Sequence, residues 1–227
     1  MSRLIITIDG PAASGKSTVA RLLAQKLNAT FLDTGAMYRA VTLAAMQTGV
    51  DLTNQKQLID TLNNTKFEFT PAAGGMLIFI NDVDVTEKIR DPQVTANARF
   101  VAASAPARGR LVGMQRQFAD AHGKIVTEGR DQGTVAFPDA DVKFYLTADL
   151  DERARRRLAE QKTKGIEQTL EQIREDIRQR DDSDQNRSIG PLKPAEDAIN
   201  VDTTDLSVEQ VVEILVACVK EKCLGKI

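Results

Sequence analysis

A glycine-rich turn near the start of the chain has the composition and spacing of a phosphate-binding site. The pattern G-x-x-x-x-G-K-S extends from Gly10 to Ser17. Glycine carries no Cβ, so the backbone can turn tightly and approach a phosphate closely. Backbone N–H groups and the positive end of a following helix then meet the anion, the lysine contacts the β- and γ-phosphates, and the serine hydroxyl ligates Mg²⁺. The residues predicted to bind a nucleoside triphosphate are Gly10, Pro11, Ala12, Ala13, Ser14, Gly15, Lys16, Ser17 and Thr18, with Ser17 as the metal ligand.

A triphosphate site alone is compatible with a kinase, a switch GTPase or an ATP-driven motor, and the arginines help to distinguish them. Phosphoryl transfer between two anions requires cations that neutralise both partners in a site without competing water. For any single arginine a solvated surface position is the simpler interpretation. Arg130 differs, because it directly follows a predicted core strand, where a bidentate guanidinium would suit a phosphate monoester. The arginines in or beside predicted turns and helix ends are Arg39, Arg108, Arg130, Arg153, Arg156, Arg157, Arg180 and Arg187.

The elements that must position these residues follow an α/β rhythm. An apolar run precedes the glycine turn, helical spacing follows it, and the same order of strand, polar turn and helix recurs. The predicted strands cover residues 4–8, 29–32, 124–127, 142–146 and 198–201. They predict a five-stranded, mostly parallel sheet with helices on both faces. Ligands bind such sheets at the carboxyl ends of the strands, so the polar turns should meet in one cleft.

The rhythm is interrupted by an alternating segment that predicts a small antiparallel β-meander. Its strands are predicted at residues 66–70, 76–80 and 83–85, with turn chemistry from Pro71 to Gly75. The insertion extends from about Leu52 to Arg90, and helices are predicted over residues 92–100 and 107–119.

Two further helices are predicted after the strand at residues 142–146. Asp149 caps the first, with Glu152 as its capping-box partner. The second follows Gly165 and carries Leu170, Ile173 and Ile177 on one face. The last helix is predicted to begin after a Ser207 cap and to bury a stripe of Val208, Val211, Val212, Leu215 and Val219.

Composition limits the class of protein. The 227 residues allow one domain with an insertion or two small domains, and 30 basic against 32 acidic residues give a net charge of −2. This field does not recruit nucleic acid or acidic membranes. There is no apolar run near the ~20 residues that span a bilayer and no signal-peptide pattern, so we expect a cytoplasmic protein without membrane partners. The two cysteines, Cys218 and Cys223, fit a reduced compartment. With no unexplained apolar helix face, we expect a monomer.

Four segments in this order resemble the bacterial cytidylate kinases, a family of nucleoside monophosphate kinases. The resemblance covers essentially the whole chain, including the predicted meander. The second and third segments are much more specific than the phosphate loop. The segments are Gly10–Thr18, Asp33–Arg39 (DTGAMYR), Glu128–Pro138 (EGRDQGTVAFP) and Arg180–Arg187 (RDDSDQNR).

The resemblance implies transfer of the γ-phosphoryl group of ATP to CMP or dCMP, with Mg²⁺. It implies a P-loop NTPase-like core over residues 1–36 and 101–227, an arginine-rich lid at about 153–187, and a monophosphate-binding region over 37–100. The implied catalytic residues are Lys16, Arg130, Asp131, Arg153, Arg156 and Arg157. The implied acceptor-binding residues are Asp33, Thr34, Tyr38, Arg39, Arg108, Arg130, Asp131, Arg180, Asp184 and Arg187.

Four residues depart from the family pattern, and two of them, Ser183 and Gln185, replace residues that are often basic. Gln132 stands where the family suggests an apolar residue, and Arg99 falls near a position expected to be a small polar contact to the base. Arg99 therefore leaves the detail of base recognition open, and the sequence alone does not separate CMP from UMP, AMP or another small acceptor such as shikimate. A non-enzymatic alternative is a nucleotide switch, but the nearest guanine-reading string, Thr65–Glu68 (TKFE), ends in Glu instead of Asp.

Overall fold

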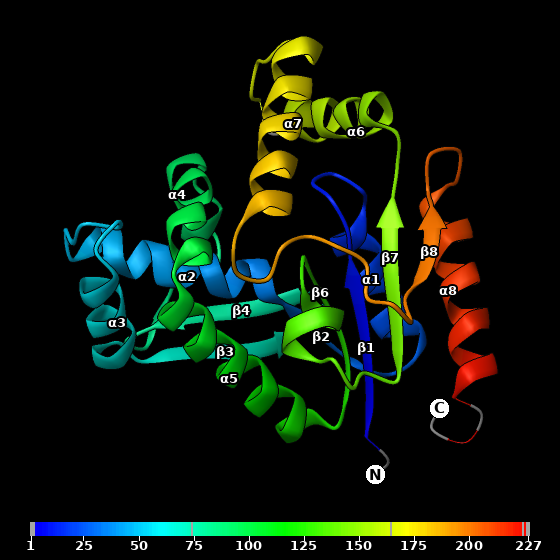
Figure 1. Ribbon diagram of the computed structural model, residues 1–227, viewed down its shortest axis with the longest axis horizontal. Helices are drawn as coiled ribbons and strands as arrows, with labels where there is room; N and C mark the ends of the chain where they lie inside the picture. The colour runs from blue at the N-terminus through cyan, green and yellow to red at the C-terminus, as the bar shows by residue number, and fades with distance from the viewer. Residues whose placement is uncertain (1–2, 74, 164, 224, 226–227) are drawn as a thin grey trace.

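The fold is organised around a five-stranded sheet in which every described strand pair is parallel. The computed structural model describes residues 3–73, 75–163, 165–223 and 225, so Gly74 of the predicted turn lies outside the described residues. The strand order is β2-β6-β1-β7-β8 (Figure 1). The strands are β1 (Leu4–Asp9), β2 (Thr30–Asp33), β6 (Lys124–Gly129), β7 (Val142–Thr147) and β8 (Ile199–Asp202). The predicted parallel sheet is confirmed, and its strand limits shift by only one or two residues.

Strand β1 lies in the middle of the sheet and is buried on both faces. All six of its residues are buried, as expected for a strand that helices cover on both sides. In the register of the sheet, Asp9 lies opposite Gly129 on β6 and Tyr145 on β7. The polar turns that follow β1 and β6 therefore begin at the same level.

Two hydrophobic clusters cover the two faces of the sheet. Helices α1 (Lys16–Lys26) and α8 (Val208–Lys222) pack on one face, and α2 (Thr34–Gln47) and α5 (Ala105–His122) contribute to the other. The predicted Ser207 cap of α8 is confirmed, because its hydroxyl accepts the Gln210 N–H and the Gln210 side chain accepts the Ser207 N–H. Of the predicted stripe on α8, Val211, Val212, Leu215 and Val219 are buried and Val208 is partly buried.

The predicted meander forms a second, antiparallel sheet of β3 (Phe67–Ala72), β4 (Gly75–Ile80) and β5 (Val83–Asp84). Its predicted turn was too long, because Pro71 and Ala72 still pair with β4. Helix α3 (Gln55–Asn64) in the same insertion was not predicted. Asn54 caps it, and it buries only two apolar side chains, Leu58 and Leu62.

Helices α4 (Pro92–Ala103) and α5 are longer than predicted and nearly continuous. Ser104 ends α4, and its side chain accepts a hydrogen bond from Ala107 at the start of α5. The 3₁₀ turn η1 (Lys88–Arg90) precedes α4, and the π-helical turn η2 (Gln132–Ala136) follows β6. The predicted borders at residues 36/37 and 100/101 fall inside α2 and α4, and one hydrophobic cluster extends across both.

Helices α6 (Leu150–Thr163) and α7 (Leu170–Asn186) form a pair beyond the carboxyl ends of the strands (Figure 1). Asp149 caps α6 as predicted, because its side chain accepts the Asp151 N–H. The predicted capping box is wrong: the backbone N–H of Asp149 donates to Thr204, and the Glu152 side chain pairs with Arg155 and Arg156 instead. Of the face predicted for α7, Ile173 and Ile177 are buried, whereas Leu170, the first residue of the helix, is 42% exposed. Within the described residues, no helix is long and apolar enough to cross a membrane.

Candidate active site

The predicted phosphate loop connects β1 to α1 and has the backbone that its glycines require. Gly10 has φ 153°, and a Cβ there would collide with the carbonyl oxygen of Leu146 on β7. Gly15 ends the loop at φ 87° and serves as the N-cap of α1 without a side-chain cap. Between them, Ala13 adopts φ 58°, which is uncommon for a residue with a Cβ. The loop thus lies directly before a free helix N-terminus, the arrangement that binds phosphate.

Lys16 is buried beneath this loop. Its Nζ donates to the Pro11 carbonyl oxygen at 2.7 Å and lies 3.4 Å from the Ser14 hydroxyl. Burial lowers the pKa of Lys16 to about 7, and the neighbouring charge of Arg130 acts in the same direction. A triphosphate at this position would restore the ammonium charge, because an opposite charge favours the ionised form.

Ser17, the predicted metal ligand, lies in an oxygen-rich corner of the site. Its hydroxyl donates to Glu128 Oε1 at 2.8 Å, and Glu128 is 6% exposed at the end of β6. A hydroxyl and a carboxylate oxygen are the kind of donors that Mg²⁺ prefers. Glu128 is the first residue of the EGRDQGTVAFP segment, but no role was predicted for it from the sequence. The feature that could have indicated its role is an acidic residue at the carboxyl end of a strand, β6, that pairs with β1.

Asp9, just before the loop, was also missed. It is buried, and its carboxylate accepts the backbone N–H groups of Gln132 at 2.9 Å and Gly133 at 2.8 Å. Burial raises the pKa of Asp9 to about 6, although the two N–H groups oppose this shift. The carboxylate joins the start of the phosphate loop to η2, the turn that follows Arg130 and Asp131.

Helix α2 presents the DTGAMYR segment to the same end of the sheet. Asp33 caps the helix by accepting the Ala36 N–H at 2.7 Å, and it pairs with Arg39 at 3.5 Å. Thr34 donates to the Glu128 carbonyl oxygen at 2.7 Å. The Arg108 guanidinium lies 5.6 Å from the ring centre of Tyr38, whose pKa burial raises to about 12. These contacts hold Thr34 against β6, join Arg39 to Asp33 and place Arg108 over Tyr38.

A chain of guanidinium–carboxylate contacts joins the remaining predicted acceptor residues. Arg108 forms a buried ion pair with Asp131, which Arg187 approaches at 3.7 Å. Arg130 Nε donates to Asp184 at 2.7 Å, and Arg187 lies 3.5 Å from the same carboxylate. The structure therefore brings together residues from α5, the turn after β6 and the end of α7.

Gly190, which sequence reasoning overlooked, permits this close packing. It adopts φ 57°, and a Cβ there would collide with both Asp131 and Arg108. Its only signal in the sequence is its place beside Pro191, three residues after Arg187. The remaining predicted residue, Arg180, interacts electrostatically with Arg130, Arg39 and Arg157, so it belongs to the same cationic group.

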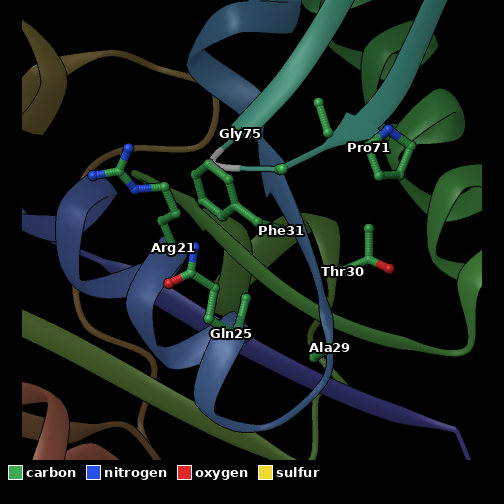
Figure 2. A pocket seen from close by; sticks show the side chains of 10 residues that line it. Arg21, Gln25, Ala29, Thr30, Phe31, Pro71 and Gly75 are labelled. Atoms are coloured by element: carbon green, nitrogen blue, oxygen red, sulfur yellow. The ribbon is translucent and has the colours of Figure 1, made fainter.

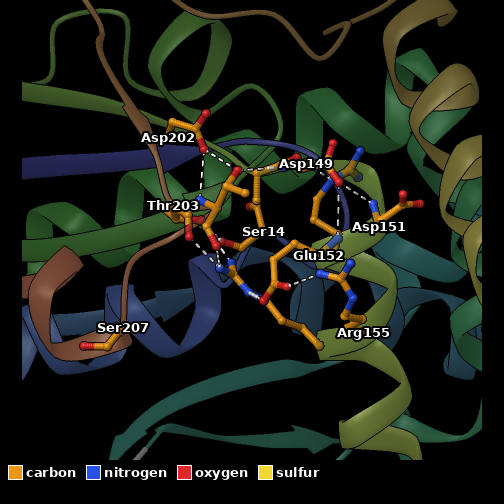
Figure 3. A network of polar contacts seen from close by, with 12 residues as sticks. Ser14, Asp149, Asp151, Glu152, Arg155, Asp202, Thr203 and Ser207 are labelled. Atoms are coloured by element: carbon orange, nitrogen blue, oxygen red, sulfur yellow. Dashed lines mark hydrogen bonds and ion pairs between the residues drawn. The ribbon is translucent and has the colours of Figure 1, made fainter.

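The three arginines of α6 have different surroundings. Arg153 is buried and donates to the carbonyl oxygens of Ala148 and Ala12. Arg156 donates to Thr203 and pairs with Glu152 in the network shown in Figure 3. One of its terminal nitrogens lies 4.0 Å from the position of a Cβ on Gly15. Arg157 pairs with Glu160 at 2.9 Å and is 38% exposed.

Gln132 and Arg99, which depart from the family pattern, lie in different places. Gln132 is buried, and its Oε1 accepts from Thr127 Oγ1 at 3.0 Å. Arg99 is exposed on α4, with its guanidinium 4.9 Å from the ring centre of Phe100. A separate pocket of about 260 Å³ lies between α1, β2 and the β3–β4 hairpin, lined in part by Arg21, Phe31 and Pro71 (Figure 2). It contains no predicted site residue.

Comparison with known proteins agrees with this arrangement. A profile of the cytidylate kinase family matches residues 6–221. The chain belongs to the cytidylate kinase family. It is 47% identical over 223 residues to a cytidylate kinase from Anoxybacillus flavithermus, covering 98% of this chain and 99% of that protein. A cytidylate kinase from Bacillus cereus is 46% identical over 217 residues and covers 96% of each chain.

The family resemblance inferred from the four segments is therefore confirmed. A solved structure of an uncharacterised protein from Eubacterium ventriosum has a TM-score of 0.53 at 13% identity, covering 97% of this chain and 99% of that chain. At this identity the likeness shows the fold alone. Membership of the cytidylate kinase family rests on the sequence relatives.

Proposed function

We propose that the protein transfers the γ-phosphoryl group of ATP to CMP or dCMP, giving ADP and CDP or dCDP. The observation that carries the proposal is the meeting of a phosphate loop with arginines from α2, α5, β6 and α7 at one end of the sheet, in a chain of the cytidylate kinase family. A nucleotide-binding switch would need only the loop. Arginines from four separate elements suit a second anionic substrate.

On the donor side, the loop N–H groups and Lys16 bind the β- and γ-phosphates of ATP. The hydroxyl of Ser17 and the carboxylate of Glu128 suit Mg²⁺, and we propose that they hold it directly or through water. Mg²⁺ bound there supplies positive charge to the transferring phosphoryl group. Lys16 reaches the site from a buried position, so its charge acts in a medium of low dielectric, where it stabilises an anion more strongly than in water.

On the acceptor side, Arg39, Arg130 and Arg180 bind the phosphate of CMP. Asp184 accepts hydrogen bonds from the sugar hydroxyls and orients Arg130, with which it is already paired. Asp131 lies between Arg108 and Arg187, so we assign it to acceptor binding, beside Thr34 and Tyr38, and give it no part in the phosphoryl transfer itself. The acceptor phosphate is already an oxyanion, so the reaction needs orientation in line with ATP and no strong general base.

Arg156 and Arg157 lie on α6 at the edge of this group, and we propose that they supply charge to the transferring phosphoryl. Arg156 is beside Gly15, and Arg157 interacts electrostatically with Arg180. Their present partners, Glu152 and Glu160, are on the same helix. Because the ion pairs are partly exposed, exchanging them for a phosphate costs little. Closure over ATP of the part of the α6–α7 pair beyond the contacts of Arg153 and Asp181 with the phosphate loop would exclude water before transfer.

The test is ADP formation from ATP and Mg²⁺ with CMP, dCMP, UMP, AMP and shikimate as separate acceptors. We expect rapid turnover with CMP and dCMP and much slower turnover with UMP. Rapid turnover with another acceptor and little with CMP would retain the phosphoryl chemistry and reject the base assignment. ATP binding with no acceptor-dependent ADP would reject the kinase proposal.

Three further assignments complete the proposal. We assign the core, the lid at about 153–187 and the monophosphate-binding region at 37–100 as units of movement. The monophosphate-binding region is not a separately folded domain, since one hydrophobic cluster includes residues of this region and of the sheet. The protein acts as a monomer in the cytoplasm. Analytical ultracentrifugation with and without CMP tests the oligomeric state, and a dimer in either condition would contradict it.

A further inference from the structure

The two backbone polar groups of Ala12, in the phosphate loop, are each held by a side chain. Its N–H donates to Asp181 Oδ1 at 2.9 Å, and its carbonyl oxygen accepts from Arg153 at 3.1 Å. Arg153 and Asp181 also form an ion pair with each other. The loop is thus joined to α6 through Arg153 and to α7 through Asp181.

The position of this contact within the loop matters. The next residue, Ala13, adopts φ 58°, which costs free energy for a residue with a Cβ. Such a conformation persists when neighbouring contacts determine it. Hydrogen bonds on both sides of Ala12 fix the orientation of the backbone immediately before Ala13, and hence the direction in which the following N–H groups point.

Stability alone is a poor explanation for the ion pair. Arg153 and Asp181 are 8% and 7% exposed, and on the same two helices Ala154, Ile173 and Ile177 form a small apolar cluster with Ala12. Removing two charges from water costs about as much as their attraction returns, so buried pairs often contribute little to stability. Arg153 also donates to the Ala148 carbonyl oxygen, so its protein partners already engage the guanidinium on more than one side.

We propose that Arg153 and Asp181 are positioning residues, which hold the phosphate loop in the shape that binds the triphosphate of ATP. Arg153 then acts through Ala12 and does not contact the transferring phosphoryl group, in contrast to the role that the family resemblance implied for it. The proposal rests on the proposed function for the identity of the donor. It does not depend on the acceptor being CMP.

The test compares Asp181→Asn with Asp182→Asn. Asp182 is the next residue on α7 and is exposed, so it provides a matched change of charge on the same helix. Binding of ATP with Mg²⁺, measured by calorimetry without an acceptor, is expected to weaken about tenfold in Asp181→Asn, the scale of one charge-assisted hydrogen bond. Asp182→Asn should bind within about twofold of the unchanged protein. Equal affinities in the two variants would overturn the proposal.

A second measurement separates positioning from general damage to the fold. CMP affinity and melting temperature are measured for Asp181→Asn, and the expected result is that CMP affinity changes less than about twofold while ATP affinity falls. A parallel loss of both affinities would identify a merely structural role. If CMP does not bind to the unchanged protein, the acceptor assignment has failed, and the comparison of ATP affinities, supported by the melting temperatures, still decides this inference.

Arg153 gives an independent check through Arg153→Met combined with Asp181→Asn. The double variant removes both buried charges, so it should melt higher than Arg153→Met alone, in which Asp181 has lost its partner. We expect ATP affinity to remain about tenfold weaker in the double variant despite the recovered stability. Recovery of ATP affinity would overturn the positioning role. So would a variant that binds ATP normally but turns over slowly, because that result would place Arg153 in direct contact with the reacting group.

Discussion

The donor and acceptor ends of the cleft hold charge in different ways. Around the phosphate loop, backbone groups and Lys16 face the site, and side-chain contacts hold the loop backbone in place. On the acceptor side, the arginines are paired with the chain's own carboxylates, as in the contacts of Arg108 with Asp131 and of Arg130 with Asp184. In the function that we propose, a backbone held by hydrogen bonds therefore meets the donor, and an ion-paired network of side chains meets the acceptor.

This difference has consequences for selectivity. A backbone loop recognises phosphate groups, which all nucleoside triphosphates share. A guanidinium held by a carboxylate is oriented before the substrate arrives, but the substrate must share it with that carboxylate. Only an anion that fits the existing geometry obtains this contact at low cost. We infer that discrimination between substrates resides mainly on the acceptor side.

The largest effect is expected at the donor end, at Lys16, which is the one cationic residue of the phosphate loop itself. Lys16→Met should lower kcat by about 10²- to 10³-fold, the cost of removing one preorganised donor from a transition state. Lys26→Met, at the exposed end of the same helix, is the control and should leave kcat unchanged. Steady-state kinetics with ATP and CMP give both values. If kcat fell less than threefold in Lys16→Met, the positive charge at the donor end would be shared among more groups than we infer.

At the acceptor end the loss should be smaller, because several arginines share the phosphate. Arg130→Ala is expected to lower kcat/KM for CMP by about tenfold or more. The matched control is Arg178→Ala, which removes an exposed arginine paired with Glu175 on α7. Unchanged kinetics in Arg130→Ala would remove Arg130 from the site.

The buried ammonium of Lys16 also makes stability depend on pH. The pKa of Lys16 falls from 10.5 to about 7 through burial first and the charge of Arg130 second. Between these values the unfolded chain binds the proton and the folded chain does not, so this group makes stability rise with pH from 7 towards 10.5. Without nucleotide, Lys16→Met should therefore melt several degrees above the unchanged protein at pH 7, and the gap should narrow as pH rises. A difference in melting temperature between the two proteins that does not change with pH would contradict the lowered pKa of Lys16.

The smallest effect is expected at Gln132, which lies behind the acceptor turn. Gln132→Met removes the acceptor of the buried Thr127 hydroxyl and should cost about 1 kcal/mol in the free energy of unfolding. CMP affinity should change less than about twofold, because the backbone N–H of residue 132 can still donate to Asp9. Gln185→Met, at an exposed position on α7, is the control for stability. Denaturant unfolding provides the comparison, and a large loss of CMP affinity would place Gln132 in the site.

The donor loop could be predicted from the sequence because its chemistry is local. Gly10, Gly15 and Lys16 are at fixed spacing between a strand and a helix, and the structure gives these glycines the positive φ angles that the pattern requires. The five-stranded sheet followed from apolar runs in the same way. Arg130 was singled out correctly as a charge directly after a core strand, at the end of β6.

The residues that sequence reasoning missed act through partners distant in the chain. Asp9 holds η2 across 123 and 124 positions, and Glu128 meets Ser17 across 111. Neither relation can be inferred without the strand order, which places β6 beside β1. The unpredicted helix α3 has a different cause: it is short and mostly polar, and its only large apolar residues are Leu58, Ile59 and Leu62, although these share one face.

The central position of β1 also determines when the sheet can form during synthesis. Leu4 pairs with Lys124 and Ile6 with Val142, so the first strand made must wait for partners that leave the ribosome much later. At about 5–20 residues per second the delay is on the order of ten seconds. Throughout that time the apolar residues Leu4–Ile8 are without their sheet partners, and such segments readily pair with other chains. Nascent chains that end before β7 should therefore aggregate or bind chaperones, and the centre of the sheet should form only after β7 has left the ribosome.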